Sequence, residues 1–404
     1  MKSKIITLIA ALFLLQGFSF AADRIVLEGG VTPNYSSITS ALVGIPANTR
    51  ILVFPKSGGD AYIGNLTIPN VAGVQILSAV DGQRFVVQGD ISTGTAGNAV
   101  ISGAETSGKI YLYGTGNRVI GCKVYGYIQS MLYSSLNYID NDSVVNNGSI
   151  GMHRGRVSGC YVEGNITTDG SIAGLTDTTF IVGNHVRILN AGIFSMGVNC
   201  QGSNQTVCVA NNFIEISGTN AGNGNGIRLF AIKSSASVRS ACMNNTIWDR
   251  SVTGFIVAGI AVDSASFSVD IENNVFLGNH LGTKSFQFYY PSSDAGGGFR
   301  YNYSNISLID NFTPDGSNNL NANISINPLT GELLTGSDGV DGGNPGDAHR
   351  DIDLSRNDAG CYGGSFTRSN FTVAETGVRV LFMTAPRTVF TNTPFMISAD
   401  GVDK

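Results

Sequence analysis

A short unit of strand, polar corner and strand recurs along this chain and limits what it can fold into. Residues 206–217 contain the clearest copy, in which two apolar segments flank the pair Asn211-Asn212. The same pattern returns at Asn244-Asn245 and at Asn273-Asn274. A unit that recurs every ~20–50 residues is typical of a solenoid, in which each unit buries its apolar face by stacking on its neighbours.

Weaker copies of this unit extend in both directions. When the second corner residues are aligned, eight positions share one column, at intervals of 20, 18, 24, 28, 33, 29 and 28 residues. Such unequal intervals fit coils whose loops vary in length while their strands stay in register. Stacked amides in register can hydrogen-bond to one another, which avoids a cost of about 1–3 kcal/mol for each buried polar group without a partner. We expect this structural stack to comprise Cys122, Asp142, Cys160, Asn184, Asn212, Asn245, Asn274 and Asn302.

The composition favours strands and tight turns over amphipathic helices. Of the 404 residues 52 are glycine, and 13 % are charged, against about 25 % in typical soluble domains. The net charge of −5 is too small and too scattered to indicate a nucleic-acid partner. We therefore expect no nucleic acid among the partners.

The N-terminus has the organisation of a secretory signal peptide. Two lysines precede the apolar residues 5–15, and residues 19–21 form a small-x-small cleavage pattern. The apolar run is shorter than the about 20 residues that a membrane-spanning helix needs. We therefore expect a signal peptide over residues 1–21 and a mature chain that begins near Ala22. That chain would be secreted, periplasmic or on the cell surface, without a transmembrane segment.

The remaining chain divides into four predicted parts. An N-terminal cap with the first coils is expected over residues 22–98, including a short helix within residues 35–42. Parallel coils with three strands per turn should follow over residues 99–325. A closing coil rich in Asp and Gly is expected at residues 326–368. A β tail over residues 369–404 could cap the open end of the solenoid or begin an appended β-module.

The repeated corner unit resembles the right-handed parallel β-helix repeat of the pectin-lyase-like superfamily over residues 99–305. This resemblance implies an all-β solenoid. The superfamily includes polysaccharide lyases and hydrolases, phage tailspikes and surface proteins without known activity, so the resemblance selects no single function. The passages at residues 333–344 and 351–364 are similar to the closing motif of exported bacterial β-helix proteins, which implies a last coil.

In the enzymes of this superfamily, the substrate lies across the outer face of one strand column. Since side chains alternate between the two faces of a strand, taking Ile193, Ile227, Phe255 and Phe286 as inward defines one lateral face. That face has one cation, several aromatic or apolar side chains and no carboxylate. The ligand-binding candidates on it are Phe194, Arg228, Phe230 and Tyr289.

This face favours binding over catalysis. Hydrolysis of a glycosidic bond normally needs two carboxylic acids, and the polygalacturonase and pectate lyase motifs are missing. We expect a non-catalytic exported protein that binds glycan or a cell-envelope component. The alternatives are a divergent polysaccharide lyase or hydrolase acting on an acidic polysaccharide, and a purely structural module. The aromatic side chains could instead be covered by a loop, and Arg228 could be an ordinary surface charge.

Four aspartates near the C-terminus form a candidate metal site. Carboxylate oxygens are the ligands that Ca²⁺ prefers, and a structural Ca²⁺ is the one cofactor that the sequence indicates. The alternative is a network of Asp turns in which Arg356 is the counter-ion. The four residues are Asp341, Asp351, Asp353 and Asp358.

One disulfide is possible. Cys200 and Cys208 flank a short loop, and disulfides form in exported proteins. The alternative is that both are buried, because free cysteine often behaves as a small apolar side chain.

Overall fold

The computed structural model describes most of the chain beyond the N-terminus. The described residues are 21–170, 178–189, 195–202, 206–218, 222–230, 232, 240–251, 255–262, 269–278, 284–288, 298–307, 309–310, 316–371, 379–384 and 398–402. Residues 1–20 of the predicted signal peptide lie outside the described residues.

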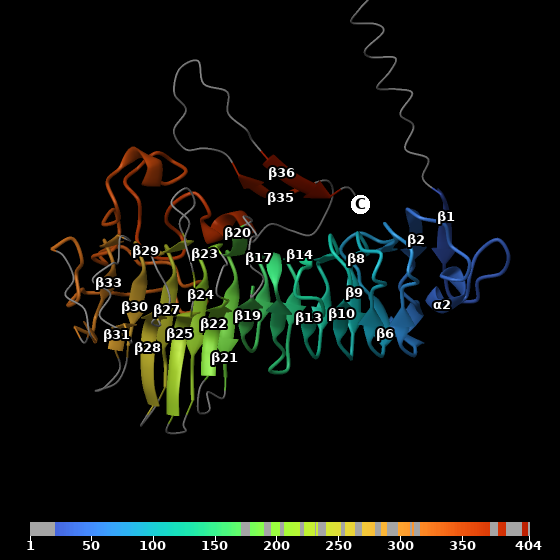
Figure 1. Ribbon diagram of the computed structural model, residues 1–404, viewed down its shortest axis with the longest axis horizontal. Helices are drawn as coiled ribbons and strands as arrows, with labels where there is room; N and C mark the ends of the chain where they lie inside the picture. The colour runs from blue at the N-terminus through green and yellow to red at the C-terminus, as the bar shows by residue number, and fades with distance from the viewer. Residues whose placement is uncertain are drawn as a thin grey trace, which may run out of the picture.

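Three long parallel sheets wrap around a common axis (Figure 1). Sheet A contains 12 strands, and sheets B and C contain 11 each. The chain passes from a strand of sheet A to one of sheet B, then to one of sheet C, and returns to sheet A one position further along. This architecture matches a right-handed parallel β-helix with three strands per coil, as the corner repeat predicts.

The strands of each sheet are as follows, in the order in which they pair. Sheet A comprises β1 (Ala21–Val26), β2 (Thr49–Val53), β5 (Gln75–Ser78), β8 (Val100–Ser102), β11 (Arg118–Ile120), β14 (Leu136–Asp140), β17 (Arg154–Ser158), β20 (Thr178–Val182), β23 (Thr206–Ala210), β26 (Ser240–Met243), β29 (Val269–Glu272) and β32 (Phe299–Arg300). Sheet B comprises β3 (Ala61–Ile63), β6 (Phe85–Gln88), β9 (Ala104–Thr106), β12 (Lys123–Val124), β15 (Ser143–Val144), β18 (Tyr161–Val162), β21 (His185–Ile188), β24 (Phe213–Ile216), β27 (Thr246–Asp249), β30 (Val275–Leu277) and β33 (Tyr303–Ser304). Sheet C comprises β4 (Leu66–Thr67), β7 (Ile91–Ser92), β10 (Ile110–Leu112), β13 (Ile128–Ser130), β16 (Ile150–Met152), β19 (Ile166–Asp169), β22 (Ser195–Gln201), β25 (Gly222–Phe230), β28 (Phe255–Val262), β31 (Lys284–Phe288) and β34 (Ile309–Asp310).

A continuous apolar core fills the inside of the coils. Along sheet A, for example, Val119, Ile139, Val157 and Ile181 occupy paired positions of successive strands, and all are fully buried. Each such side chain contributes about 1.5–3 kcal/mol when it is removed from water. Because only stacked coils can bury this column, each coil depends on its neighbours.

The N-terminal end of the core is covered by the helix α2 (Ile38–Ala41), within the predicted segment. Its N-cap is Ser37, whose side-chain oxygen accepts the N–H of Ser40. Ile38, Ala41 and the following Leu42 are buried against the first coil. Three short 3₁₀ helices complete the helical content of the described residues: Ser57–Gly59, Asp347–His349 and Arg368–Phe371. Within the described part of the chain, no helix is both long and apolar enough to cross a membrane.

The corner between sheets A and B requires a special backbone conformation at its first residue. That residue has a φ between 52° and 69° in nine successive coils. This left-handed region is least costly for glycine and is tolerated by asparagine, which explains why these two residues dominate the position. The nine residues are Gly103, Gly121, Asn141, Gly159, Gly183, Asn211, Asn244, Asn273 and Tyr301.

The second corner residue forms a ladder of hydrogen bonds along the axis. Oδ1 of Asn245 accepts both the backbone N–H and the side-chain Nδ2 of Asn212, at 3.1 and 2.9 Å. The same pair of bonds links Asn184 to Asn212, Asn245 to Asn274, Asn274 to Asn302, and Asn302 to Asn318. Asn318 therefore extends the stack one coil beyond the column expected from the sequence. In the earlier coils, the carboxylate of Asp142 accepts the backbone N–H of Cys122.

Residues 326–368, here called the C-terminal segment, lie along this corner and do not add a coil. The Nδ2 of Asn211 donates to the carbonyl of Cys361, and the Nδ2 of Asn244 donates to the carbonyl of Asp358. Apolar residues of the segment also pack on the outer face of sheet B against Phe213, Val275 and Tyr303. The described residues of 326–368 add no strand to the three sheets, so the expectation of a closing coil differs from the structure.

The tail forms a two-stranded antiparallel hairpin of β35 (Arg379–Thr384) and β36 (Ser398–Val402). It lies alongside the middle coils, near β14 to β20 (Figure 1). Phe382 packs against Phe180 of sheet A. The hairpin therefore docks on the side of the solenoid, which neither sequence alternative foresaw.

Candidate functional site

A cluster of polar and aromatic side chains lies on the outer face of sheet B. It spans four consecutive coils, from β18 to β27. We call it the Glu215 cluster, after the buried carboxylate at its centre. Its members are Tyr161, Glu163, His185, Arg187, Glu215, Trp248 and Arg250.

Strand register brings these residues together. Tyr161 pairs with His185 in adjacent strands, and Arg187, Glu215 and Trp248 occupy paired positions of β21, β24 and β27. Since side chains alternate along a strand, the intervening residues, such as Val162, Val186, Ile214 and Ile247, face the core and the members of the cluster face outward. Adjacent strands lie about 4.8 Å apart, so the members of each column can touch.

Glu215 is held by three cationic or polar partners. Its Oε1 lies 2.6 Å from Nε2 of His185 and 3.4 Å from Nε of Arg187, while its Oε2 accepts a hydrogen bond of 3.0 Å from Arg250. The Glu215 side chain is 6 % exposed, whereas those of Arg187 and Arg250 are 34 % and 43 % exposed. Two guanidinium groups therefore cover a buried carboxylate and keep part of their surface in solvent.

The second half of the cluster surrounds Tyr161. Its hydroxyl accepts a hydrogen bond from Arg187 at 3.3 Å and donates one to Glu163 at 3.1 Å. Its ring meets the imidazole of His185 edge-on at 5.2 Å. On the other side, the guanidinium of Arg250 lies 4.5 Å from the centre of the Trp248 ring. The cluster thus combines two arginines with two aromatic rings.

The protonation states follow from burial and from these contacts. Burial lowers the pKa of His185, and the positive charges of Arg368 and Arg187 lower it further, against the raising effect of Glu215. Burial tends to raise the pKa of Glu215, but the bonds from His185 and Arg250 and the charge of Arg187 outweigh it and hold that pKa below its usual value. Near neutral pH the carboxylate is therefore ionised and the imidazole neutral. The proton of His185 then lies on Nε2, which donates to Glu215, and Nδ1 keeps its lone pair.

The C-terminal segment closes one side of the cluster. Arg368 donates to the carbonyl of Thr330 at 2.7 Å, and its guanidinium lies over the ring of Phe213. The same ring stacks on His185 at 4.8 Å. Gly331 approaches Phe213 so closely that a Cβ there would lie 2.4 Å from the ring. The Glu215 cluster consequently marks the point where the covered part of sheet B ends.

Chemically, this arrangement suits an anionic ligand with ring faces. Partly exposed guanidinium groups bind carboxylates through paired hydrogen bonds. Tyr161 and Trp248 are partly buried, and Trp248 packs against the apolar cluster around Phe213, so only part of each ring can pack against the apolar face of a sugar. The neutral imidazole and the phenol could also accept or donate a proton.

Two of the four residues predicted from the sequence, Arg228 and Phe230, lie on a different face, that of sheet C. Arg228 points outward from sheet C, with its guanidinium 5.0 Å from the Phe230 ring centre. Phe194 and Tyr289 lie outside the described residues. The structure therefore brings together two of the four candidates, away from the Glu215 cluster.

The expected register of sheet C was also wrong. Ile227 pairs with Val198 on one side and with Ile260 on the other, in place of Ile193 and Phe255. The pairing of Ile260 with Phe286 continues the column. No repeated corner marks the start of β22, β25 and β28, so residues counted from the sequence alone fell out of step.

Three of the four candidate calcium ligands, Asp351, Asp353 and Asp358, use their carboxylates to accept backbone N–H groups within turns. The carboxylate of Asp351 accepts the N–H groups of Gly364 and Asp358, and the carboxylate of Asp358 accepts the N–H of Asp341. Asp353 caps the N–H of Ser355. No group of three or more His, Cys, Asp or Glu side chains in the described residues is arranged to hold a metal ion. These donors do not fit a Ca²⁺ site.

Arg356 has a different role from the counter-ion that the sequence suggested. Its Nε and Nη2 donate to the carbonyls of Gly343 and Gly342, at 2.9 and 3.1 Å. It therefore ties two turns of the C-terminal segment together through their backbones.

The possible disulfide between Cys200 and Cys208 is a further correction, since both thiols are free and buried. Cys200 belongs to the main core between the sheets, whereas Cys208 packs in a separate cluster on the outer side of sheet A. Burial raises the pKa of each thiol to about 12, so both stay protonated.

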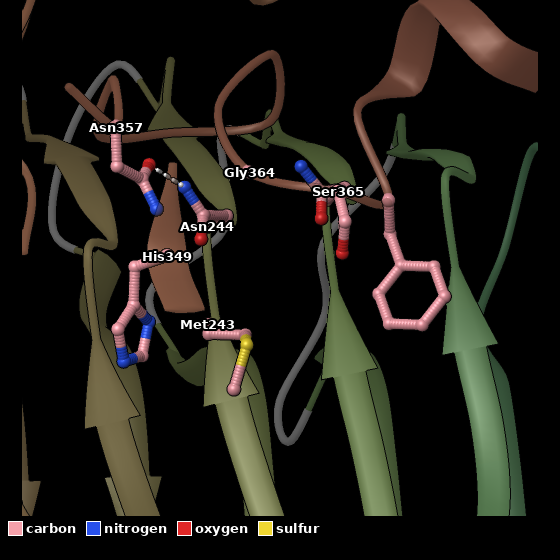
Figure 2. Close-up of a pocket in the computed structure, with 8 residues that line it drawn as sticks. Met243, Asn244, His349, Asn357, Gly364 and Ser365 are labelled. Carbon is pink, nitrogen blue, oxygen red and sulfur yellow. Dashed lines mark hydrogen bonds between the residues drawn. The ribbon is translucent and has the colours of Figure 1, made fainter. Parts of the chain in front are cut away.

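A cavity of about 200 Å³ lies where the C-terminal segment crosses the corner. Figure 2 shows Met243 and His349 beside it, with Asn244 donating to Asn357 at 2.9 Å across its top. Asn211 and Asn244, which line it, already hold the segment through their amides. The cavity is thus a gap between two packed layers, and its polar lining serves the fold.

The sequence did contain a signal for the Glu215 cluster. Arg187, Glu215 and Trp248 each stand three positions after a member of the corner column, namely Asn184, Asn212 and Asn245. The corner alignment therefore predicts that they share one outward column. The lateral face predicted from the sequence lies on sheet C and does not include them.

Comparisons with known proteins find similarity in structure and none in sequence. No protein-family model and no curated protein sequence matches the chain. Among solved structures, the chain is similar to the crystal structure of pectate lyase Pel9A, with 14 % sequence identity and a TM-score of 0.41. The match covers 86 % of this chain and 98 % of that one.

Proposed function

We propose that the protein binds an acidic polysaccharide across the outer face of sheet B, at the Glu215 cluster. The observation that supports this is the convergence of Arg187 and Arg250 on the buried Glu215, beside the Trp248 ring. Glu215 contacts both guanidinium groups, and the two arginine side chains remain 34 % and 43 % exposed. A uronate chain would place carboxylates on the arginines and ring faces on Trp248 and Tyr161.

The size of the effect follows from the chemistry of the contacts. Hydrogen bonds to charged groups contribute about 1.5–3 kcal/mol each, and part of that is lost to screening because both arginines are partly exposed. We therefore expect modest affinity for a single sugar and tighter binding of longer chains. Binding should weaken as salt concentration rises.

A comparison of the affinities for a charged polymer and its uncharged form tests this proposal. Isothermal titration calorimetry would compare polygalacturonate with the same polymer after full methyl esterification, which keeps the sugar rings and removes the charges. We expect heat of binding with the free acid and a loss of at least about tenfold in affinity, or 1.4 kcal/mol, with the ester. Equal affinity for the two polymers would contradict a carboxylate-binding site.

A second candidate function is β-elimination on the same substrate class, and the state of His185 favours it. Nδ1 of the neutral imidazole could take the proton from the carbon next to the uronate carboxylate. The C–O bond to the leaving sugar then breaks, a C=C bond forms, and the leaving oxygen takes a proton from the Tyr161 hydroxyl. Arg187 or Arg250 would neutralise the carboxylate and so favour removal of that proton.

Ultraviolet absorbance of the unsaturated product separates the two candidates. Turnover that is lost in both His185→Gln and Tyr161→Phe, with polymer binding retained, would establish the lyase. If the wild-type protein binds the polymer without any change in absorbance, the binding function is supported and the lyase is contradicted. Arg228→Gln on sheet C is the matched control, and we expect it to change neither readout.

We propose, from the signal peptide predicted over residues 1–21, that this binding takes place outside the cytoplasm. N-terminal sequencing of the protein purified from its native host should find a mature chain that starts near Ala22. Recovery of a chain that still begins at Met1 would contradict export by this route.

A further inference from the structure

A second row of cations and rings lies on the outer face of sheet A. Arg118, Tyr138, Arg156 and Phe180 occupy paired positions of the consecutive strands β11, β14, β17 and β20. Cation and ring alternate along the row, and strands about 4.8 Å apart put the two arginines about 10 Å from each other along the axis. The guanidinium of Arg118 lies 5.0 Å from the centre of the Tyr138 ring, and that of Arg156 lies 5.2 Å from it.

The two arginines converge on one carboxylate of the tail. Asp400 in β36 receives a bond of 2.6 Å from Nη1 of Arg156 and one of 3.3 Å from Nη2 of Arg118. Arg156 is also held by the sheet itself, because its Nε and Nη2 donate to the two carboxylate oxygens of the buried Asp140, both at 2.8 Å. The third nitrogen is left to point outward, where Asp400 meets it.

A ring of the tail completes the same site. The ring centre of Phe382 in β35 lies 4.6 Å from the guanidinium of Arg156, which the Tyr138 ring also contacts. It also packs on Phe180 at 5.1 Å and stacks on Phe366 with the planes 3° apart. The tail thus presents one carboxylate and one ring to the row.

The hairpin that supplies these groups has little stability of its own. A two-stranded hairpin alone is marginally stable in water, and two of its side chains, Val380 and Met383, are 63 % and 57 % exposed. Its docking therefore depends on the contacts of Asp400 and Phe382. Groups held in this way can be displaced by a ligand that offers the same chemistry.

We propose that the Arg118–Arg156 row is a second binding site, for a carboxylate-bearing saccharide, and that the tail hairpin is its intramolecular occupant. A saccharide fits better than a peptide strand. The backbone groups of β11 to β20 are engaged in the sheet ladder, which leaves no free edge for strand addition. The face offers side chains only, namely cations for carboxylates and rings for sugar faces.

The row shares no residue with the Glu215 cluster, so this inference stands independently of the function proposed for sheet B. While the tail is docked, the apparent affinity of the row is reduced by the fraction of molecules in which it is open. Release of the tail should therefore uncover binding.

The test uses the full chain in an Arg187→Gln background, which removes the sheet B contribution. Calorimetry would measure the affinity of an oligogalacturonate for two proteins. One is the Arg187→Gln variant, and the other carries Asp400→Asn and Phe382→Ala in addition. We expect at least tenfold tighter binding when the tail contacts are removed, and we expect Arg118→Gln to abolish the gain. The matched control is Asp353→Asn with Leu329→Ala, which removes an exposed carboxylate and an exposed apolar group outside the hairpin and should gain nothing.

Three results would overturn the inference. One is no gain in binding on release of the tail, in variants whose thermal melting shows an intact solenoid. Another is a gain that survives Arg118→Gln. The last is a gain in dimer formation without a gain in oligogalacturonate binding, which would assign the row to the tail of a second copy.

Discussion

The side-chain amide of Asn212 donates to Oδ1 of Asn245, one coil further along the axis, at 2.9 Å. This contact repeats from Asn184 to Asn318 and fixes the register of the coils on which every outward residue depends. A shift of one residue would turn each outward side chain of a strand toward the core. The ladder is therefore structural, and it sets the positions of Arg187 and Glu215.

Replacement of Asn245 by leucine should break the ladder in its middle. The substitution removes donors to Asn274 and to the carbonyl of Val209, and it removes the acceptor of Asn212. We expect a loss of about 1–3 kcal/mol in the free energy of unfolding, measured by chemical denaturation. Asn321→Leu, at an exposed asparagine outside the ladder, is the control. Equal stability of Asn245→Leu and the wild-type protein would contradict the structural role.

The stability of the protein should also depend on the backbone conformation of the first corner residue. Asn141 has a φ of 56°, and the equivalent residues of the neighbouring coils are Gly121 and Gly159, with φ of 62° and 63°. Alanine at this position carries the steric cost of the left-handed region, about 1–2 kcal/mol, which glycine avoids. We therefore expect Asn141→Ala to be less stable than Asn141→Gly by about that amount. The reverse order in denaturation would show that the corner backbone is not constrained in this way.

Stability should depend on pH through His185. Its pKa in the folded protein lies below its ordinary value, mainly because the ring is buried, and the unfolded value is about 6.5. Below pH 6.5 the unfolded chain therefore binds a proton more readily than the folded one, so stability is present above that pH and is lost as the pH falls. His185→Gln should lose less stability than the wild-type protein between pH 8 and 5. Parallel stability curves for the two proteins would refute the assignment of a neutral, buried His185.

Removal of divalent ions should leave the protein unchanged. The carboxylates of Asp351 and Asp358 accept backbone N–H groups and do not form a fitting set of calcium ligands. We expect the same melting temperature with and without excess chelator. A fall of several degrees would restore the calcium site that the sequence suggested.

Much of the fold could be predicted from the sequence because its determinants are local and repeated. A positive φ at the first corner residue and an amide at the second recur in each coil, and both leave a visible trace at Asn211-Asn212 and its copies. The register of sheet C was predicted wrongly because no comparable marker follows β21, β24 and β27.

The sites were harder to predict for a related reason. Glu215 and Arg187 are close only because Asn184 and Asn212 align their coils, so the cluster appears once outward columns are counted from the corner. The contact between Arg156 and Asp400 joins residues 244 positions apart, and no repeat connects the tail to the coils. Only packing in three dimensions could reveal it.

The central claim is that the Glu215 cluster on sheet B binds an acidic polysaccharide. The most direct test compares the affinity for polygalacturonate of three variants, each of which removes one arginine from a different surface: Arg187→Gln on sheet B, Arg228→Gln on sheet C, and Arg300→Gln. Arg300 is a matched control, because it pairs with the buried Glu272 at 3.0 Å and is similarly exposed, at 46 %. We expect Arg187→Gln to weaken binding by at least about tenfold, or 1.4 kcal/mol, and the other two to leave it unchanged. A loss in Arg228→Gln with full binding by Arg187→Gln would contradict the account.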